Sequence, residues 1–382
     1  MLNSQRSTFN SLLIFTDWFS PAYKAGGPIR SIVNLVDRFK EEYAIHVFTS
    51  DRDLNEQKPF EGIVVDQWVE QDGYKIWYYS PGSMTYKKVK EVFREVNPDK
   101  MYLNSMFSNM ILPLMAAGRS GKIILAPRGM LRVSALSIKP LKKYFYLSFL
   151  RMLNIDQSIT FHSTGKDETN DIRRIFPRAA NIVEAPNLPV AVNKELIPLS
   201  KTAGTLRMVF VGRMHPIKNL LFLLESMQTL QGNIEFDIIA TTEDQSYAAL
   251  CNNLIDMLRE RMQIHVHLDL PHHHIKPILE KAHVFVLPTE GENFGHAIFE
   301  ALAVGCPVII SNQTPWKDLS TSSAGFDLPL SKETFSLHLQ KFIDMDDAEW
   351  QGYRKGAWQK AQQYEESLSQ ASGYTSLFTV NQ

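Results

Sequence analysis

Residues 284–310, VFVLPTEGENFGHAIFEALAVGCPVII, contain the pattern from which the fold is inferred. The apolar run 284–287 is typical of a strand buried on both faces. The segment 289–295 supplies turn residues and two glycines whose backbone can approach a ligand closely. Residues 297–304 are predicted to form a helix, which Gly305 ends. The stretch therefore predicts a strand, a glycine-rich turn, a helix and a second strand of one parallel sheet.

Two glutamates, Glu292 at the turn and Glu300 in the helix, indicate the chemistry of this stretch. The backbone amides of Asn293, Phe294 and Gly295 are expected to point out of the helix N-terminus, where they form an anion site. An acidic side chain beside such an anion is favourable only if it bonds neutral hydroxyl groups, which sugars and ribose supply. The predicted ligand is therefore a phosphate flanked by polyols, that is, a sugar nucleotide.

The composite of Glu292-Asn293-Phe294-Gly295 with Glu300 resembles the E-x7-E motif of the family 4 retaining glycosyltransferases. The following SNQTPWKDL (311–319) and GFDLPL (325–330) are similar to a bacterial branch that builds surface polysaccharides. The resemblance implies an α/β GT-B fold, with two Rossmann-like doubly wound parallel-sheet domains facing a central cleft. The alternative interpretation is an ordinary strand–helix–strand unit with solvated glutamates.

Composition sets the broad class of the protein. A chain of 382 residues with 44% apolar and 21% charged residues is predicted to be a globular protein of two domains. Residues 1–180 hold 25 Lys and Arg against 18 Asp and Glu, whereas the remainder holds 15 against 23. The basic first half suggests an anionic partner, or else a chance asymmetry of two solvated surfaces. Two cysteines and no apolar leader or spanning segment predict a cytoplasmic protein without disulfides.

The first domain is predicted to span residues 1–190, with strands and helices alternating in a parallel sheet. A strand at 11–16 precedes Gly26 and Gly27, whose loop suits a phosphate at the N-terminus of the next helix. It resembles the glycine-rich loop of the family. Arg128 follows a strand at 122–126 and suits anion recognition, where many family members carry a His. The segments 63–68 and 74–79 are predicted to form a hairpin.

A linker is predicted at 191–205, a second domain at 206–360, and a C-terminal helix at 361–382 that returns toward the first domain. The second domain opens with a strand at 206–211, and Arg213 and Lys218 follow it. Two cations at a strand end beside a helix N-terminus can clamp a diphosphate leaving group.

Residues 138–155 combine basic with aromatic and aliphatic residues. Such a segment could lie at an anionic membrane surface, on the inner face of the cytoplasmic membrane, or grip a lipid-linked acceptor. The equally weighted alternative is a core-packing helix with a solvated basic face. The three histidines at 272–274 are predicted to be a solvated turn, because three consecutive residues cannot all face one metal ion.

The resemblance implies a role for each matched residue. Glu300 is expected to hold the ribose hydroxyls and Glu292 the donor-sugar hydroxyls, while Arg213 and Lys218 neutralise the departing diphosphate. It implies a hexosyltransferase that uses a UDP- or GDP-sugar as substrate, retains the anomeric configuration, and needs neither a metal nor another cofactor. The expected acceptor is a saccharide, and no nucleic acid partner is expected. The rival classes are another GT-B enzyme (a sugar-nucleotide epimerase or a phosphorylase) and a non-catalytic sugar-nucleotide-binding protein.

Overall fold

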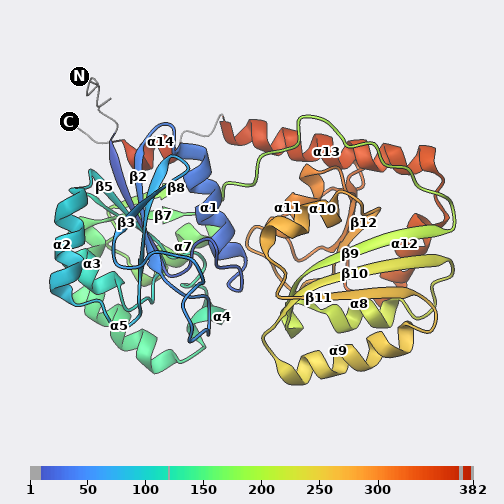
Figure 1. The fold of residues 1–382 in the computed structure, drawn as a ribbon, viewed down its shortest axis with the longest axis horizontal. Coiled ribbons are helices and arrows are strands. Elements are labelled where there is room, and N and C mark those ends of the chain that lie inside the picture. The colour runs from blue at the N-terminus through green and yellow to red at the C-terminus, as the bar shows by residue number, and fades with distance from the viewer. Residues whose placement is uncertain (1–9, 119–120, 370–372, 380–382) are drawn as a thin grey trace. The chain divides into compact units, whose positions relative to one another are not determined.

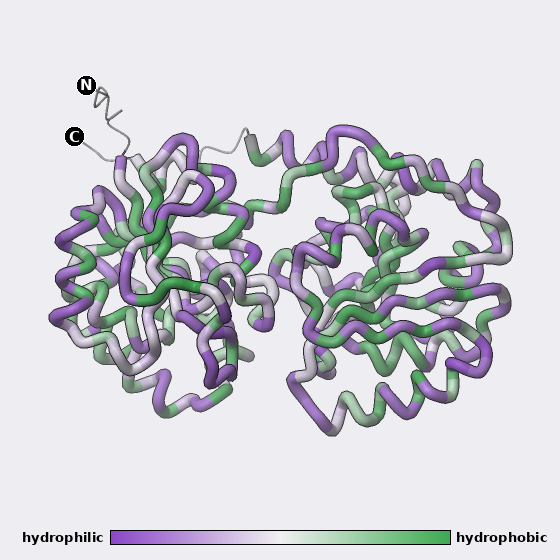
Figure 2. The backbone as a smooth tube through the Cα atoms, in the orientation of Figure 1, coloured by the Kyte–Doolittle hydropathy of each residue, from purple (hydrophilic) through white to green (hydrophobic). Residues whose placement is uncertain are grey.

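The structure is a computed structural model that describes residues 10–118, 121–369 and 373–379. The chain divides into two compact units, Met1–Leu188 with Ser369–Gln382 and Pro189–Leu368 (Figure 1). Each unit has its own sheet covered by helices, which confirms the prediction of two α/β domains. Hydrophobic residues run along the inner strands of both sheets, as Figure 2 shows.

The sheet of the first unit has the order β3-β4-β2-β1-β5-β6-β7-β8. All neighbouring strands pair in parallel except β3 and β4, which are antiparallel at one edge. The strands are β1 Ser11–Thr16, β2 Ala44–Ser50, β3 Trp68–Gln71, β4 Tyr74–Tyr79, β5 Lys100–Asn104, β6 Ile123–Ala126, β7 Thr160–Ser163 and β8 Asn181–Glu184.

Helices cover both faces of this sheet. Successive residues of a strand point to opposite faces, and here both sets are apolar and buried. Leu12 and Ile14 join the core under helices α1 and α14, whereas Leu13 and Phe15 join the core under α2, α3, α5 and α7. The helices are α1 Gly27–Phe39, α2 Tyr86–Val96, α3 Ile111–Ala117, α4 Val133–Leu136, α5 Pro140–Met152, α6 Ile155–Ser158, α7 Lys166–Ile175 and α14 Gly373–Phe378.

The hairpin prediction is wrong in its first strand. That strand is Trp68–Gln71 instead of residues 63–68, and it pairs antiparallel with Tyr74–Tyr79. Asp72 and Gly73, both with positive φ, form a two-residue turn, so the strand must run directly into that turn. Val65 makes only an isolated bridge to Tyr78.

The second unit has a six-stranded, entirely parallel sheet of order β11-β10-β9-β12-β13-β14. Its strands are β9 Thr205–Met214, β10 Asn233–Thr242, β11 Gln263–Leu268, β12 Val284–Leu287, β13 Val308–Ser311 and β14 Gly325–Leu328. The stretch 284–310 therefore folds as predicted, into adjacent parallel strands joined by a helix. Strand β9 continues three residues beyond the predicted end at 211, so that Gly212 and Arg213 lie in the strand.

One contiguous hydrophobic core fills the second unit. Its helices are η1 Pro216–Lys218, α8 Leu220–Ser226, α9 Gln245–Leu258, η2 His272–His274, α10 Ile275–Leu279, α11 His296–Ala303, α12 Lys332–Asp344 and α13 Asp347–Ser369. In Figure 1, α10, α11 and α13 lie on one side of the sheet and α8 and α9 on the other. Such two-sided cover is the arrangement expected for a parallel sheet whose strands are buried on both faces.

Residues in the predicted linker pack against the second unit. The Lys201 ammonium group is buried and donates to the carbonyl oxygens of Ile343 and Met345, at 3.0 and 2.6 Å. The side chain of Trp358 donates to the carbonyl oxygen of Asn193 at 2.8 Å. These bonds order the polypeptide that leads into β9.

Candidate active site

The predicted donor-site residues of the second unit gather at one edge of its sheet. Arg213 lies at the end of β9, Lys218 follows it in η1, and Glu292 to Gly295 follow β12. Because β9 and β12 are parallel neighbours, their carboxyl ends meet at the same edge. Ligands of open parallel sheets bind at this edge.

Lys218 and Glu292 form an ion pair between Nζ and Oε1. Backbone bonds that join the two loops bring this pair together. The carbonyl oxygen of Ile217 accepts from the Glu290 amide at 2.8 Å and from the Thr289 hydroxyl at 2.9 Å. The side chains of Lys218 and Glu292 are only 17% and 13% exposed, so water screens their interaction weakly.

Arg213 also has a carboxylate partner. Its guanidinium group pairs with Glu243, which follows β10, the neighbour of β9 on the other side. Both side chains are about two-fifths exposed, at 39% and 43%, so this pair contributes little stability and can exchange partners. Glu243 is a residue of the candidate site that the sequence analysis missed, and the signal that points to it is its position just after a predicted strand.

The N-terminus of α11 has the geometry of an anion site. Gly295 is the N-cap, with φ of 79°. Among the residues that the structure describes, none accepts a hydrogen bond from the amides of Asn293, Phe294 or Gly295. A hydrogen bond from the buried Trp316 side chain holds the turn in place, because its Nε1 atom donates to the Phe294 carbonyl oxygen at 2.6 Å. The three amides are thus held in place at the positive end of the helix.

Glu300 lies in the second turn of α11 and is 8% exposed. Its Oε1 atom lies 2.9 Å from Nε2 of His272, which follows β11. The histidine run 272–274 is therefore more than the solvated turn that was predicted, because η2 directs its first member at a buried carboxylate. The signal in the sequence was the position of the run just after a strand of the same sheet.

In the first unit, Gly26 caps α1 with φ of 64°, and Gly27 is the first residue of the helix. The loop before them is held by Asp53, a buried carboxylate that the sequence analysis missed. Asp53 accepts from the amides of Tyr23 and Lys24, at 2.8 and 3.2 Å. The loop thus presents a helix N-terminus without an acidic residue in its first turn.

Arg128 follows β6 and is held by uncharged side chains. Its guanidinium group donates to Asn104 Oδ1 at 2.8 Å, to the Tyr102 hydroxyl at 2.6 Å and to Asn187 Oδ1. The buried carboxylate of Glu168, which accepts from the Gly129 amide, interacts with the Arg128 charge, but among residues 10–118, 121–369 and 373–379 no carboxylate forms an ion pair with Arg128. A positioned cation with neutral partners suits an anionic ligand group.

His162, in β7, has a structural role. Its Nδ1 atom lies 2.7 Å from the Tyr102 hydroxyl, and its Nε2 atom lies 2.8 Å from the Ala185 carbonyl oxygen. Burial, with a further contribution from the nearby Arg128 charge, lowers the pKa of His162 to about 3. The imidazole is therefore neutral and holds Tyr102 under the Arg128 guanidinium.

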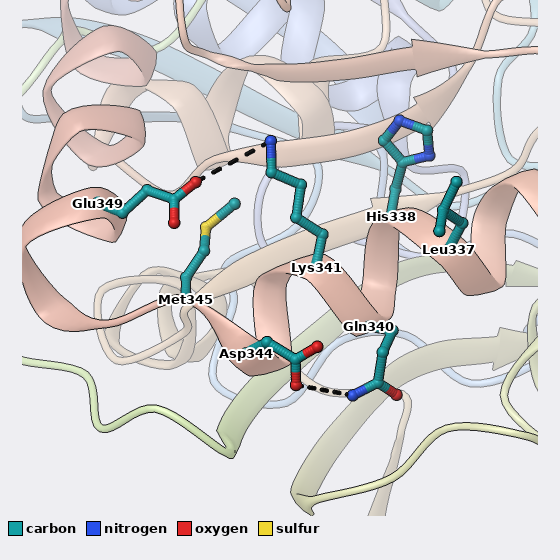
Figure 3. A pocket seen from close by; sticks show the side chains of 7 residues that line it. All are labelled: Leu337, His338, Gln340, Lys341, Asp344, Met345 and Glu349. Carbon is teal, nitrogen blue, oxygen red and sulfur yellow. Dashed lines mark hydrogen bonds and ion pairs between the residues drawn. The ribbon is translucent and has the colours of Figure 1, made fainter.

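A cavity of about 500 Å³ lies elsewhere on the second unit, between α12 and the start of α13 (Figure 3). Leu337, His338, Gln340, Lys341, Asp344, Met345 and Glu349 line it. Its polar groups largely satisfy one another, since Gln340 donates to Asp344 at 2.9 Å and Lys341 lies 4.0 Å from Glu349. No residue of the predicted site lines this cavity.

In the described part of the chain, no group of three or more His, Cys, Asp or Glu side chains has a geometry that could hold a metal ion. None of the helices described is both long and apolar enough to cross a membrane.

The family model of glycosyl transferases group 1 matches residues 205–329. The match contains Arg213, Lys218, Glu292 and Glu300. No curated protein sequence matches the chain.

Solved structures give the fold of the whole chain. Sucrose-phosphate synthase from Thermosynechococcus elongatus is similar with a TM-score of 0.69 and 17% identity, over 97% of this chain and 100% of that one. WaaG, a glycosyltransferase involved in lipopolysaccharide biosynthesis, is similar with a TM-score of 0.63 and 14% identity, over 96% and 98%. Anabaena HepE in complex with UDP-glucose is similar with a TM-score of 0.63 and 13% identity, over 94% of this chain and 98% of that one. The chain has the GT-B fold.

Proposed function

We propose that the protein is a retaining glycosyltransferase that moves a hexose from a UDP- or GDP-sugar to a saccharide acceptor in surface polysaccharide synthesis. The observation that carries this proposal is the Lys218–Glu292 pair beside the amides of residues 293–295. A nucleotide sugar joins an anionic diphosphate to a neutral polyol at one bond. A cation and a carboxylate side by side fit the two sides of that bond.

The pair of His272 and Glu300 fits the nucleoside end of the donor. Glu300 can accept hydrogen bonds from the two ribose hydroxyls, with His272 beside it to orient its carboxylate. The buried position of Glu300 makes such bonds stronger than they would be in water. Both pairs lie at the carboxyl edge of the same parallel sheet, which supports a single extended ligand.

Catalysis on this proposal consists of positioning and of stabilising the leaving group. The bond between the anomeric carbon and the diphosphate oxygen breaks, and a bond from that carbon to an acceptor hydroxyl oxygen forms on the same face. The hydroxyl proton passes to the departing diphosphate. Arg213 and Lys218 would balance the charge that develops there, so the proposed reaction needs no metal.

The first unit is proposed to serve the same reaction. The helix N-terminus at Gly26 and Gly27 would bind a phosphate group of a substrate, and Arg128 an anionic group. The similar structures include a complex with UDP-glucose and a glycosyltransferase involved in lipopolysaccharide biosynthesis, which supports a sugar nucleotide and a saccharide acceptor. We propose that the acceptor is lipid-linked. The proposed place of action is the cytoplasmic face of the membrane.

Incubation with a hexose donor and candidate acceptors, followed by NMR of the product, tests the proposal. We expect a new glycosidic bond with the anomeric configuration of the donor, formed equally well in excess EDTA. Inversion would contradict the retaining assignment, and loss of activity in EDTA would contradict the metal-independent one. A product that forms without an acceptor, such as an epimerised sugar nucleotide, would contradict glycosyl transfer and favour a rival GT-B reaction.

A further inference from the structure

Helix α5 of the first unit exposes an apolar stripe. It lies at the lower margin of that unit in Figure 1. Leu141, Phe145 and Met152 are 72, 69 and 70% exposed, and Ile138, Tyr144 and Phe149 are also exposed. Positions 141, 145, 149 and 152 repeat every three or four residues, so they lie along one side of the helix, and Ile138 lies just before its start. We call these six side chains the α5 stripe.

The stripe is not part of the core of the unit. On the opposite side of α5, Leu147 and Leu150 are buried and anchor the helix in the core. Of the eighteen exposed large hydrophobic side chains that the structure describes, eight lie within residues 133–153. Scattered exposed apolar residues need no explanation, but a concentration of this kind marks an interaction surface.

The charge around the stripe has one sign. Residues 100–155 contain nine Lys and Arg and no Asp or Glu. Lys139 and Lys142 are exposed beside the stripe. Within the described residues, neither of them forms an ion pair. The partner of this surface must therefore tolerate apolar contact and supply negative charge of its own.

We propose that the α5 stripe docks the protein on an anionic lipid bilayer, with α5 lying in the plane of the membrane. Leucine, phenylalanine and methionine would enter the boundary between headgroups and acyl chains, while lysine stems reach up to the lipid phosphates. A helix of 13 residues is far too short to span a bilayer, which leaves the interfacial orientation. The sequence analysis left two roles open for this segment, a membrane-surface helix and a core-packing helix. On this proposal α5 has both roles, because one side packs in the core and the other docks on the bilayer.

Vesicle flotation tests this docking without any substrate, so its failure would contradict the proposed place of action at the membrane but not the proposed glycosyl transfer. We expect the full chain to float with phosphatidylcholine vesicles that contain phosphatidylglycerol, and high salt to release it. Neutralising both cations with Lys139→Gln and Lys142→Gln should weaken binding roughly 25-fold, at about fivefold for each cation. Leu141→Ser with Phe145→Ser should abolish flotation.

The matched control is Met257→Ser with Leu337→Ser, two side chains of the second unit that are 65 and 68% exposed. This variant should float like the unchanged protein. All variants change exposed side chains, and unfolding curves that coincide would show that the fold is kept. Equal flotation with neutral and anionic vesicles would overturn the proposal. So would a concentration-dependent dimer that Leu141→Ser with Phe145→Ser dissociates, because the stripe would then bind a second copy of the chain.

Discussion

The Nε2 atom of His272 lies 2.9 Å from the Oε1 atom of Glu300, so that a residue of η2 orients a buried carboxylate of α11. The two residues are 28 positions apart, and each follows a strand of the same parallel sheet. If Glu300 holds the ribose of the donor, His272 acts on donor binding through it. His272 is then a positioning residue.

The variant His272→Ala should weaken nucleotide binding about 10- to 100-fold, since a hydrogen bond to a charged group contributes about 1.5–3 kcal/mol. Turnover at saturating donor should change little, because His272 does not touch the reacting carbon in this account. Calorimetric titration with the nucleotide and steady-state kinetics separate the two effects. The neighbouring His274→Ala is the control and should bind like the unchanged protein. Equal losses in both variants would contradict a specific role for His272.

Replacing Lys218 or Arg213 by Ala should lower turnover about 100-fold or more, as the loss of a group that stabilises developing charge does. The fold should be kept, because neither side chain belongs to the core. Lys332→Ala, which breaks a surface ion pair with Glu225, should leave turnover unchanged. Near-normal turnover of either site variant would refute its assignment to the leaving group.

The N-terminus of α11 offers a stability test with two glycines. Gly295 has φ of +79°, and a Cβ atom there would lie 2.8 Å from Ile298 Cδ1. Gly295→Ala should therefore lower the free energy of unfolding by about 1–2 kcal/mol or more. At Gly291 a Cβ atom would meet nothing within 4 Å, so Gly291→Ala should be nearly neutral. Urea unfolding of both variants measures the difference, and equal stabilities would show that the turn is not constrained as described.

The first unit should lose stability as the pH falls below about 6.5. His162 has a pKa of about 3 in the folded chain, below its unfolded value near 6.5, so the unfolded chain binds the extra proton. The stability due to this difference is complete above pH 6.5. About 2 kcal/mol of it should be lost by pH 5.

Hydrogen exchange in β7 at pH 7 and pH 5 would report this loss within the first unit. His162→Gln keeps one acceptor for Tyr102 and one donor for Ala185 but cannot titrate. Its exchange should therefore depend less on pH than that of the unchanged protein. The same pH dependence in both proteins would exclude His162 as the cause.

Local sequence patterns predicted most of the second unit. A short apolar run such as 284–287 indicates a buried strand, and a glycine such as Gly305 indicates the end of a helix. The partners that close the site could not be predicted in this way. Glu243 and His272 meet Arg213 and Glu300 only through the strand order β11-β10-β9-β12, which is a property of the whole sheet.

The first unit shows the same limit. The sequence around Arg128 predicts that this residue, at the end of a strand, suits anion recognition. That uncharged side chains hold it cannot be predicted locally, because Tyr102 and Asn104 come from β5 and Asn187 comes from the segment after β8. The hairpin was misplaced because the pattern of 63–68 resembles a strand, whereas the turn at Asp72 and Gly73 determines which residues pair.

The most direct test of the account is thermal unfolding of the purified protein with UDP, GDP or ADP and their common hexose derivatives, beside Glu300→Ala. A ligand at 100 times its dissociation constant should add about 2.7 kcal/mol of stability. We expect a rise in the unfolding temperature with nucleotides of one base and no rise in Glu300→Ala. Equal shifts in both proteins would contradict the role of Glu300, and no shift with any nucleotide would contradict a donor site in the second unit.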